Sequence, residues 1–134
     1  MFRAAARPSG ASAQYGQIDL NARIASASPH GLVSILFEEL LRAMGMVRKS
    51  TQPHRRSEAL SRALSILQSL NDTLNFESGG QIATSLSAIY GEARRLLLKG
   101  MREQDTAPVA EAEAMIAEIA QSWNTISEGA AVSS

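Results

Sequence analysis

The side chains best able to do chemistry in this 134-residue chain are two histidines, His30 and His54. In a helical bundle, a histidine joins a di-metal centre when a glutamate stands three residues before it, because that spacing puts both ligands on one helix face. Here Ala27 and Thr51 occupy those two positions. We therefore expect no metal site and interpret both histidines as ordinary surface residues.

The glutamates form no pattern that predicts acid–base catalysis. Glu111 and Glu118 are seven residues apart, so they share the solvated outer face of a predicted helix. The chain has no cysteine, which excludes disulfides, thiolate metal ligands and cysteine nucleophiles. Gly79 and Gly80 follow no predicted strand and precede no Gly-Lys-Ser/Thr sequence, so they do not indicate a phosphate loop. We expect no catalytic residue, no enzyme activity and no cofactor.

Charge and hydropathy argue against two further classes of function. Thirteen Lys and Arg residues balance thirteen Asp and Glu residues, so the chain lacks the positive field that nonspecific nucleic-acid binding needs. The doublets Arg55-Arg56 and Arg94-Arg95 have no aromatic residues interleaved with them. No stretch approaches the ~20 apolar residues of a membrane span. We expect no nucleic-acid partner, no membrane insertion and a cytoplasmic location.

Proline, glycine and serine divide the chain into parts. Pro8 and Gly10 interrupt a small, polar N-terminal stretch that predicts a mobile tail. Ser28 suits a helix N-cap, and Pro29 suits the first helical position, where its missing N–H costs nothing. The predicted parts are a disordered tail (residues 1–14), an apolar displaceable arm (15–27), a four-helix bundle (28–128) and a second disordered tail (129–134).

Apolar residues recur at helical spacing in four segments, and no segment shows sustained alternation with period two. Short turns between helices of this length favour antiparallel neighbours. We predict an all-α fold, an antiparallel up-down-up-down four-helix bundle with a short N-terminal arm or cap helix. The predicted helices run from about Pro29 to Lys49, from near Ser57 to the Gly79-Gly80 pair, from about Gln81 to Met101, and from a cap at Asp105 or Thr106 through the apolar seam of Val109, Ala112, Ile116, Ile119, Trp123 and Ile126.

The second and third predicted helices carry more apolar side chains than one bundle face buries. Three consecutive leucines, residues 96–98, alone cover about 200° of arc at 100° per residue. An exposed apolar excess usually marks a groove in which an amphipathic helix of a partner docks. We predict that Tyr15 and Ile18 on the arm belong to this partner site and are displaced from the groove on binding. The residues that we expect to line the groove are Ile66, Leu70, Leu86, Tyr90 and Leu97.

Four short motifs keep a fixed order along the chain: residues 15–18 (YGQI), 27–32 (ASPHGL), 79–90 (GGQIATSLSAIY) and 119–123 (IAQSW). Together they resemble the tyrosine-bearing arm, the A-S-P-x-x-L helix start and the G-G-x-I-A-x-N-L-x-x-L-Y helix of the flagellar export chaperones called FliS. The resemblance covers about residues 14–127 with the spacing of that family. Ser85 stands where the family often has asparagine, and Gly91 loosens the helix beside the predicted groove.

The resemblance implies a cytoplasmic chaperone that binds the C-terminal segment of flagellin in the apolar groove. Bound flagellin is then kept from polymerising early and stays competent for type III flagellar export. The resemblance also implies that the chaperone–flagellin complex meets the flagellar export gate. The alternative is a regulatory adaptor of the same scaffold that binds an anti-sigma factor or another flagellar protein.

Overall fold

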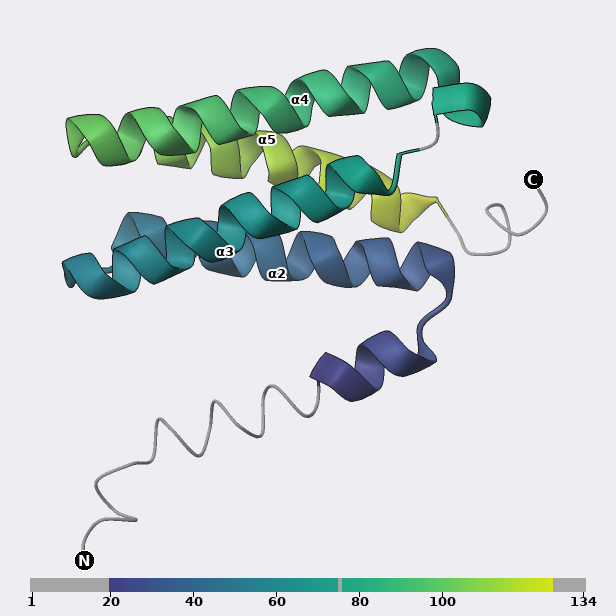
Figure 1. The fold of residues 1–134 in the computed structure, drawn as a ribbon, viewed down its shortest axis with the longest axis horizontal. Coiled ribbons are helices and arrows are strands. Elements are labelled where there is room, and N and C mark those ends of the chain that lie inside the picture. The colour runs from purple at the N-terminus through teal and green to yellow at the C-terminus, as the bar shows by residue number, and fades with distance from the viewer. Residues whose placement is uncertain (1–19, 75, 127–134) are drawn as a thin grey trace, which may run out of the picture.

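Four long helices form the described part of the protein, which a computed structural model gives for residues 20–74 and 76–126. Successive helices run in opposite directions (Figure 1), and these described residues include no strand. The predicted all-α antiparallel bundle with a short N-terminal helix is therefore confirmed. Both predicted tails, and with them Tyr15 and Ile18, lie outside the described residues. The helices are α2 (Pro29–Lys49), α3 (Pro53–Asp72), α4 (Phe76–Glu103) and α5 (Thr106–Thr125), and a short helix over residues 20–26 precedes them.

Helix α2 holds the bundle together. It packs along α3 on one side and along α5 on the other, and α4 packs mainly along α5. The contact between α3 and α4 is the least extensive of the four neighbouring pairs. The ring of helices is therefore closed most weakly between α3 and α4.

Two predicted helix caps are confirmed. The Ser28 hydroxyl accepts a hydrogen bond from the Gly31 N–H at 3.0 Å, and Pro29 opens α2. The Asp105 carboxylate accepts from the Ala107 N–H at 3.0 Å and begins α5. Each cap pairs a backbone donor that the first helical turn leaves without a partner, and such a cap is worth about 1 kcal/mol.

Helix α3 begins and ends earlier than the sequence predicts. It starts at Pro53, four residues before Ser57, because proline at the first position is preset for the helix and the Arg56 N–H already bonds the Gln52 carbonyl at 3.0 Å. It ends at Asp72, where the Thr73 hydroxyl donates to the Leu70 carbonyl at 2.7 Å.

The predicted glycine break exists, but it lies inside α4. Gly80 adopts φ 53° and ψ −124°, which is left-handed backbone that favours glycine, and the helix is kinked there. Helix α4 therefore begins upstream of the break, at Phe76, and continues regularly after it.

The core consists of apolar side chains from all four helices. Among the described residues no polar or charged residue is buried, and no helix combines the length and apolarity that a membrane crossing requires. Of the apolar residues predicted to form one face of α5, Ile119 and Trp123 are half-buried and Ile126, beyond the helix end, is exposed. The largest fully buried side chains are Leu40 and Met44 of α2, Leu70 of α3, Leu97 of α4 and Ile116 of α5.

His30 is not the ordinary surface residue that the sequence predicts. Its ring stacks on the Trp123 ring with centroids 4.4 Å apart, and the Trp123 indole N–H donates to the His30 carbonyl at 3.1 Å. The two residues are 93 positions apart in the chain, so their spacing gives no hint of this contact. His30 thus ties the start of α2 to the end of α5.

The opposite end of α2 is tied to α5 by an ion pair. The Arg48 guanidinium donates to both carboxylate oxygens of Glu113, with Nε to Oε1 at 2.6 Å and Nη2 to Oε2 at 3.1 Å. This two-point hydrogen bond raises the pKa of Arg48. Parallel hydrogen bonds between an arginine and a carboxylate fix orientation as well as distance.

The junction between α4 and α5 is tight and strained. The Asp105 N–H donates to the Gly100 carbonyl at 2.9 Å across Gln104, which has φ 53°. A Cβ atom at Gly100 would lie 2.6 Å from Cγ2 of Val109, so only glycine permits this approach of the helices. Left-handed backbone costs an L-residue such as glutamine roughly 1–2 kcal/mol.

Gln104→Gly is therefore expected to raise the free energy of unfolding by about 1 kcal/mol, because glycine adopts this φ without the steric cost. Urea denaturation followed by circular dichroism measures the change. The matched control is Glu103→Gly at the last residue of α4, which should lower stability by about 0.5–1 kcal/mol. A Gln104→Gly protein no more stable than the parent would contradict the predicted strain.

Candidate partner-binding site

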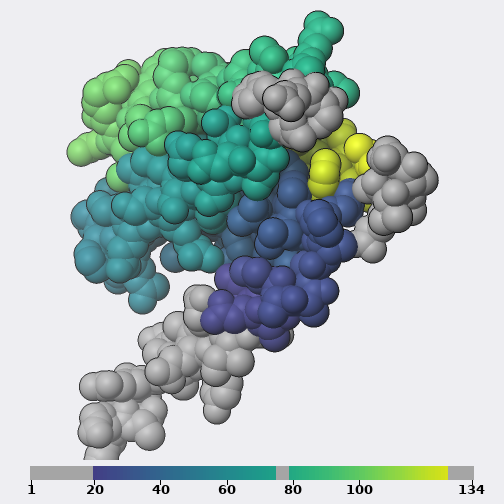
Figure 2. Space-filling model, turned by 45° about the vertical axis from the view of Figure 1, so that its right-hand side comes forward, coloured from purple at the N-terminus to yellow at the C-terminus, as the bar shows by residue number. Residues whose placement is uncertain are grey.

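The surface where α3 and α4 meet, called here the α3–α4 seam, has the least extensive helix packing in the bundle. The two helices lie side by side on one face of the molecule (Figure 2). A hollow of about 220 Å³ opens along the seam. It is lined by Leu67, Gln68 and Asn71 of α3 and by Ser87, Tyr90, Gly91 and Arg94 of α4.

Polar side chains bridge the seam above an apolar floor. The Ser87 hydroxyl donates to Oδ1 of Asn71 at 2.8 Å, from one helix to the other. Gln68 does not cross the seam, since its amide donates to Asp72 on its own helix at 2.9 Å. A neutral hydrogen bond of the Ser87 kind contributes only about 0.5–1.5 kcal/mol net.

Ion pairs join α2 to α3 and α2 to α5. In the described part of the chain, no ion pair crosses the α3–α4 seam. Arg62 of α3 pairs with Glu39 of α2 at 2.8 Å, and Arg48 joins α2 to α5. In α4, Arg95 pairs with Glu92 on the same helix at 2.6 Å. The α3–α4 seam therefore combines the least extensive packing of the four neighbouring helix pairs with the absence of an ion pair among the described residues.

The structure places four of the five predicted groove residues in the core. Ile66, Leu70, Tyr90 and Leu97 are buried, and Leu86 is half-buried against them. In the described residues these side chains therefore pack inside the bundle and do not line an open groove. Binding of a partner by these residues stays a prediction.

Tyr90 is the one predicted groove residue that also lines the seam hollow. Its side chain is 5% exposed, and burial raises the pKa of its hydroxyl to about 12. Truncation to alanine would leave a cavity in the core, at a cost of roughly 3–5 kcal/mol for an aromatic ring. Tyr90→Phe is therefore the better probe, since it keeps the ring and removes the hydroxyl.

Gly91 is exposed and lines the hollow of the α3–α4 seam. A Cβ atom built there would meet nothing within 4 Å, so the glycine leaves space in the wall of the hollow. An alanine at this position would therefore narrow the hollow without a steric clash.

The described part of the arm lies away from the seam. Residues 20–26 run beside the start of α2, on the side of the bundle opposite α4 (Figures 1 and 2). Arg23 pairs with Glu38 of α2 at 2.8 Å and holds the short helix there. Ile24 of this helix is 39% exposed. Tyr15 and Ile18, the predicted anchors, lie outside the described residues.

Sequence reasoning missed the polar rim of the seam. Asn71, Ser87 and Arg94 carry no apolar signal, so a search for excess hydrophobic surface passes over them. The spacing of two of them along α4 indicates a shared face with Tyr90, because Ser87 stands three residues before Tyr90 and Arg94 four residues after it.

The arrangement is suited to holding a peptide. Among the described residues no three His, Asp or Glu side chains gather where they could hold a metal ion. The seam instead offers amide and hydroxyl groups at its rim and apolar side chains directly below. Helical bundles of this architecture are scaffolds on which partner sites are built from side chains of facing helices.

Comparison with known proteins identifies the family. The model of the family described as flagellar protein FliS matches residues 11–130. The chain is 35% identical to the flagellar secretion chaperone FliS of Salmonella typhimurium over 117 residues, which are 84% of this chain and 87% of that protein. It is 30% identical to the protein of the same name from Escherichia coli, over 81% of this chain and 83% of that one. The flagellar secretion chaperone FliSB of Pseudomonas aeruginosa is 28% identical, over 85% and 93%.

This chain therefore belongs to the FliS family of flagellar secretion chaperones. The resemblance read from the four short motifs is confirmed, and the relatives are named for a chaperone role, which is not an enzymatic one.

Burial of Tyr90 predicts a pH dependence. The folded protein favours the neutral phenol, so this stabilisation is complete below pH 10 and is lost as the pH rises toward about 12. The ultraviolet absorbance of tyrosinate should show a step near pH 12 in the parent, and that step should be missing from Tyr90→Phe. The chain has two tyrosines, so the variant identifies which step belongs to Tyr90. Ionisation of Tyr90 near pH 10 would mean that its hydroxyl is in water.

Proposed function

We propose that this protein is a cytoplasmic flagellar export chaperone that binds the C-terminal segment of flagellin at the α3–α4 seam. Its relatives carry the name flagellar secretion chaperone, and such a chaperone needs a surface that covers part of its cargo. The observation that carries the proposal is the weak closure of the bundle between α3 and α4.

Opening of the seam is the step that makes the apolar surface available. As α3 and α4 move apart, Ile66, Leu70, Tyr90 and Leu97 gain room to pack against a guest helix. Fully burying one such side chain is worth about 1.5–3 kcal/mol, so a guest that covers them replaces the contacts that the opened helices lose. The Asn71–Ser87 hydrogen bond is the polar contact that must break.

The guest is a segment that orders on binding. Segments of this kind bury about 1,000–3,000 Å² and lose several kcal/mol to ordering, so the complex forms without being irreversible. Covered in this way, flagellin does not polymerise early and stays competent for type III flagellar export. Tyr15 and Ile18 act as the displaceable arm of the chaperone, and the export gate receives the chaperone–flagellin complex.

A disulfide across the seam tests the proposal in a chain that has no cysteine of its own. Asn71→Cys with Ser87→Cys places a cysteine on each side of the seam, at two positions whose Oδ1 and Oγ atoms lie 2.8 Å apart in the parent. Oxidation should weaken binding of a peptide from the last ~40 residues of the native flagellin at least about tenfold, and reduction should restore it. Isothermal titration calorimetry measures both states.

The matched control locks a different helix pair with the same two residue types. The Ser34 hydroxyl of α2 donates to Asn124 of α5 at 3.3 Å, so Ser34→Cys with Asn124→Cys joins α2 to α5 and leaves the seam free. Its oxidised form should bind the peptide as its reduced form does. Equal binding by the oxidised and reduced seam variant, with the cross-link verified, would rule out binding through an opened seam.

A further inference from the structure

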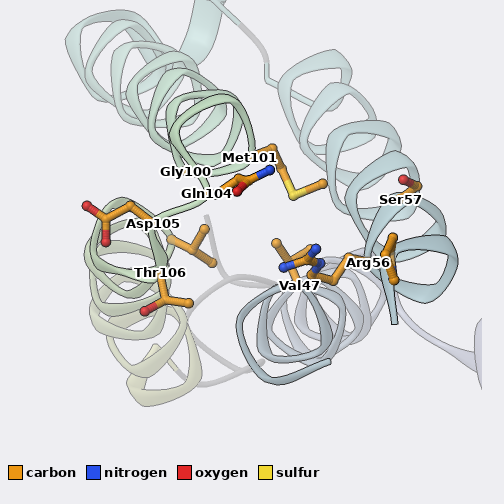
Figure 3. Close-up of a pocket in the computed structure, with 10 residues that line it drawn as sticks. Val47, Arg56, Ser57, Gly100, Met101, Gln104, Asp105 and Thr106 are labelled. Carbon is orange, nitrogen blue, oxygen red and sulfur yellow. The ribbon is translucent and has the colours of Figure 1, made fainter. Parts of the chain in front are cut away.

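A second hollow lies at the end of the bundle where α2 ends and α3 begins, about three turns of α3 away from the seam (Figure 3). Its volume is about 200 Å³, and all four long helices contribute to its wall. Pockets that hold drug-sized ligands are larger, at roughly 300–1,000 Å³, so this one has the size for a single side chain or a small ion.

Arg56 extends from the first turn of α3 into this hollow, toward Val47 and Met101 (Figure 3). Its Nε atom is buried and has no hydrogen-bond partner, and no carboxylate among the described residues pairs with its guanidinium. A buried donor on a charged group is costly unless an acceptor satisfies it. The carboxyl end of α4 lies beside the hollow and favours a positive charge there, but that leaves Nε without an acceptor.

Gln104 reaches the same hollow from the end of α4 (Figure 3). The backbone of Gln104 is left-handed, with φ 53°, a conformation that glycine adopts more easily. The glutamine side chain at this position therefore carries a conformational cost. The nearby carboxylate of Asp105 points away from Arg56 and accepts from the Ala107 N–H instead (Figure 3). The interior therefore presents a guanidinium and an amide without a facing carboxylate.

Charge near the start of α3 favours an acidic partner. Of the six Lys or Arg residues in 42–62, three pair with Glu39 or Glu113, and no ion pair among the described residues involves Lys49, Arg55 or Arg56. A planar guanidinium binds a carboxylate through two parallel hydrogen bonds. On one side of the guanidinium the two donors are Nε and a terminal Nη.

We propose that this hollow is a recognition site for the carboxylate side chain of an acidic peptide segment, bound by Arg56 with Gln104 at the rim. The site is separate from the seam and does not depend on flagellin binding there. It gives the chaperone a second contact point, which takes a Glu or Asp side chain of a partner while the seam is free or occupied.

Nuclear magnetic resonance on the full chain labelled with ¹⁵N tests the proposal directly, because the Nε–H group of Arg56 has its own signal. The probes are N-acetylglutamate N-methylamide, its glutamine counterpart and inorganic phosphate. The glutamate probe should shift the Arg56 signal saturably, and the neutral glutamine probe should bind at least about tenfold more weakly. Equal shifts with both amides, tighter binding of phosphate, or no saturable shift would each overturn the proposal.

Three variants separate recognition from structure. Loss of the Nε–H signal in Arg56→Lys assigns that signal to Arg56. Because lysine keeps the charge but not the planar fork, the variant should bind the glutamate probe about tenfold more weakly, as followed by the backbone amide signals of Gln104 and Val109 beside the hollow. Arg55→Lys, at the exposed neighbouring position, is the matched control and should bind as the parent does. If Arg56→Lys lowers the melting temperature, its effect on binding can no longer be separated from its effect on folding. Gln104→Gly then tests the site, because it removes the amide at the rim and is expected to stabilise the fold. Unchanged binding by Gln104→Gly and by a folded Arg56→Lys would overturn the site.

Discussion

The two-sided packing of α2 is the constraint on which the rest of the structure depends. Its wide apolar stripe buries Leu40 and Met44 and reaches both α3 and α5 at once. The His30–Trp123 stack and the Arg48–Glu113 ion pair fix the two ends of the α2–α5 contact. Because α4 joins the bundle mainly through α5, the ring is left weakest between α3 and α4.

This unequal distribution of contacts matters for a chaperone. A bundle closed equally on all sides would offer a guest chain no preferred point of entry, and opening it would cost core contacts everywhere. Here the strong contacts keep α2, α3 and α5 in register, while a neutral hydrogen bond and partial packing hold the seam. In the proposed mechanism, stability and access to the core thus belong to different helix pairs, and local opening would need far less free energy than global unfolding.

The two hollows differ in the chemistry that they offer. The seam has a polar rim over the apolar core, so it suits a long amphipathic segment whose affinity comes from buried area. The hollow at the bundle end is small and centred on one guanidinium, so it suits a single charged group whose orientation matters. Arg55 and Arg56 are neighbours in sequence, yet only Arg56 enters that hollow, because successive helix residues point about 100° apart.

The sequence by itself determined the helical class, the position of α2, the cap at Ser28 and the family, and it narrowed the cap of α5 to Asp105 or Thr106, since spacing, caps and motifs are local properties. Only the tertiary structure decided which apolar faces are buried. Periodicity shows that Leu70 and Leu97 share a face with other apolar residues, but it does not say which neighbour covers that face. Contacts between distant residues, such as His30 with Trp123 and the approach of Arg56 to the end of α4, depend on how the helices are placed in space. That placement follows from the packing of all four helices together, which no single segment encodes.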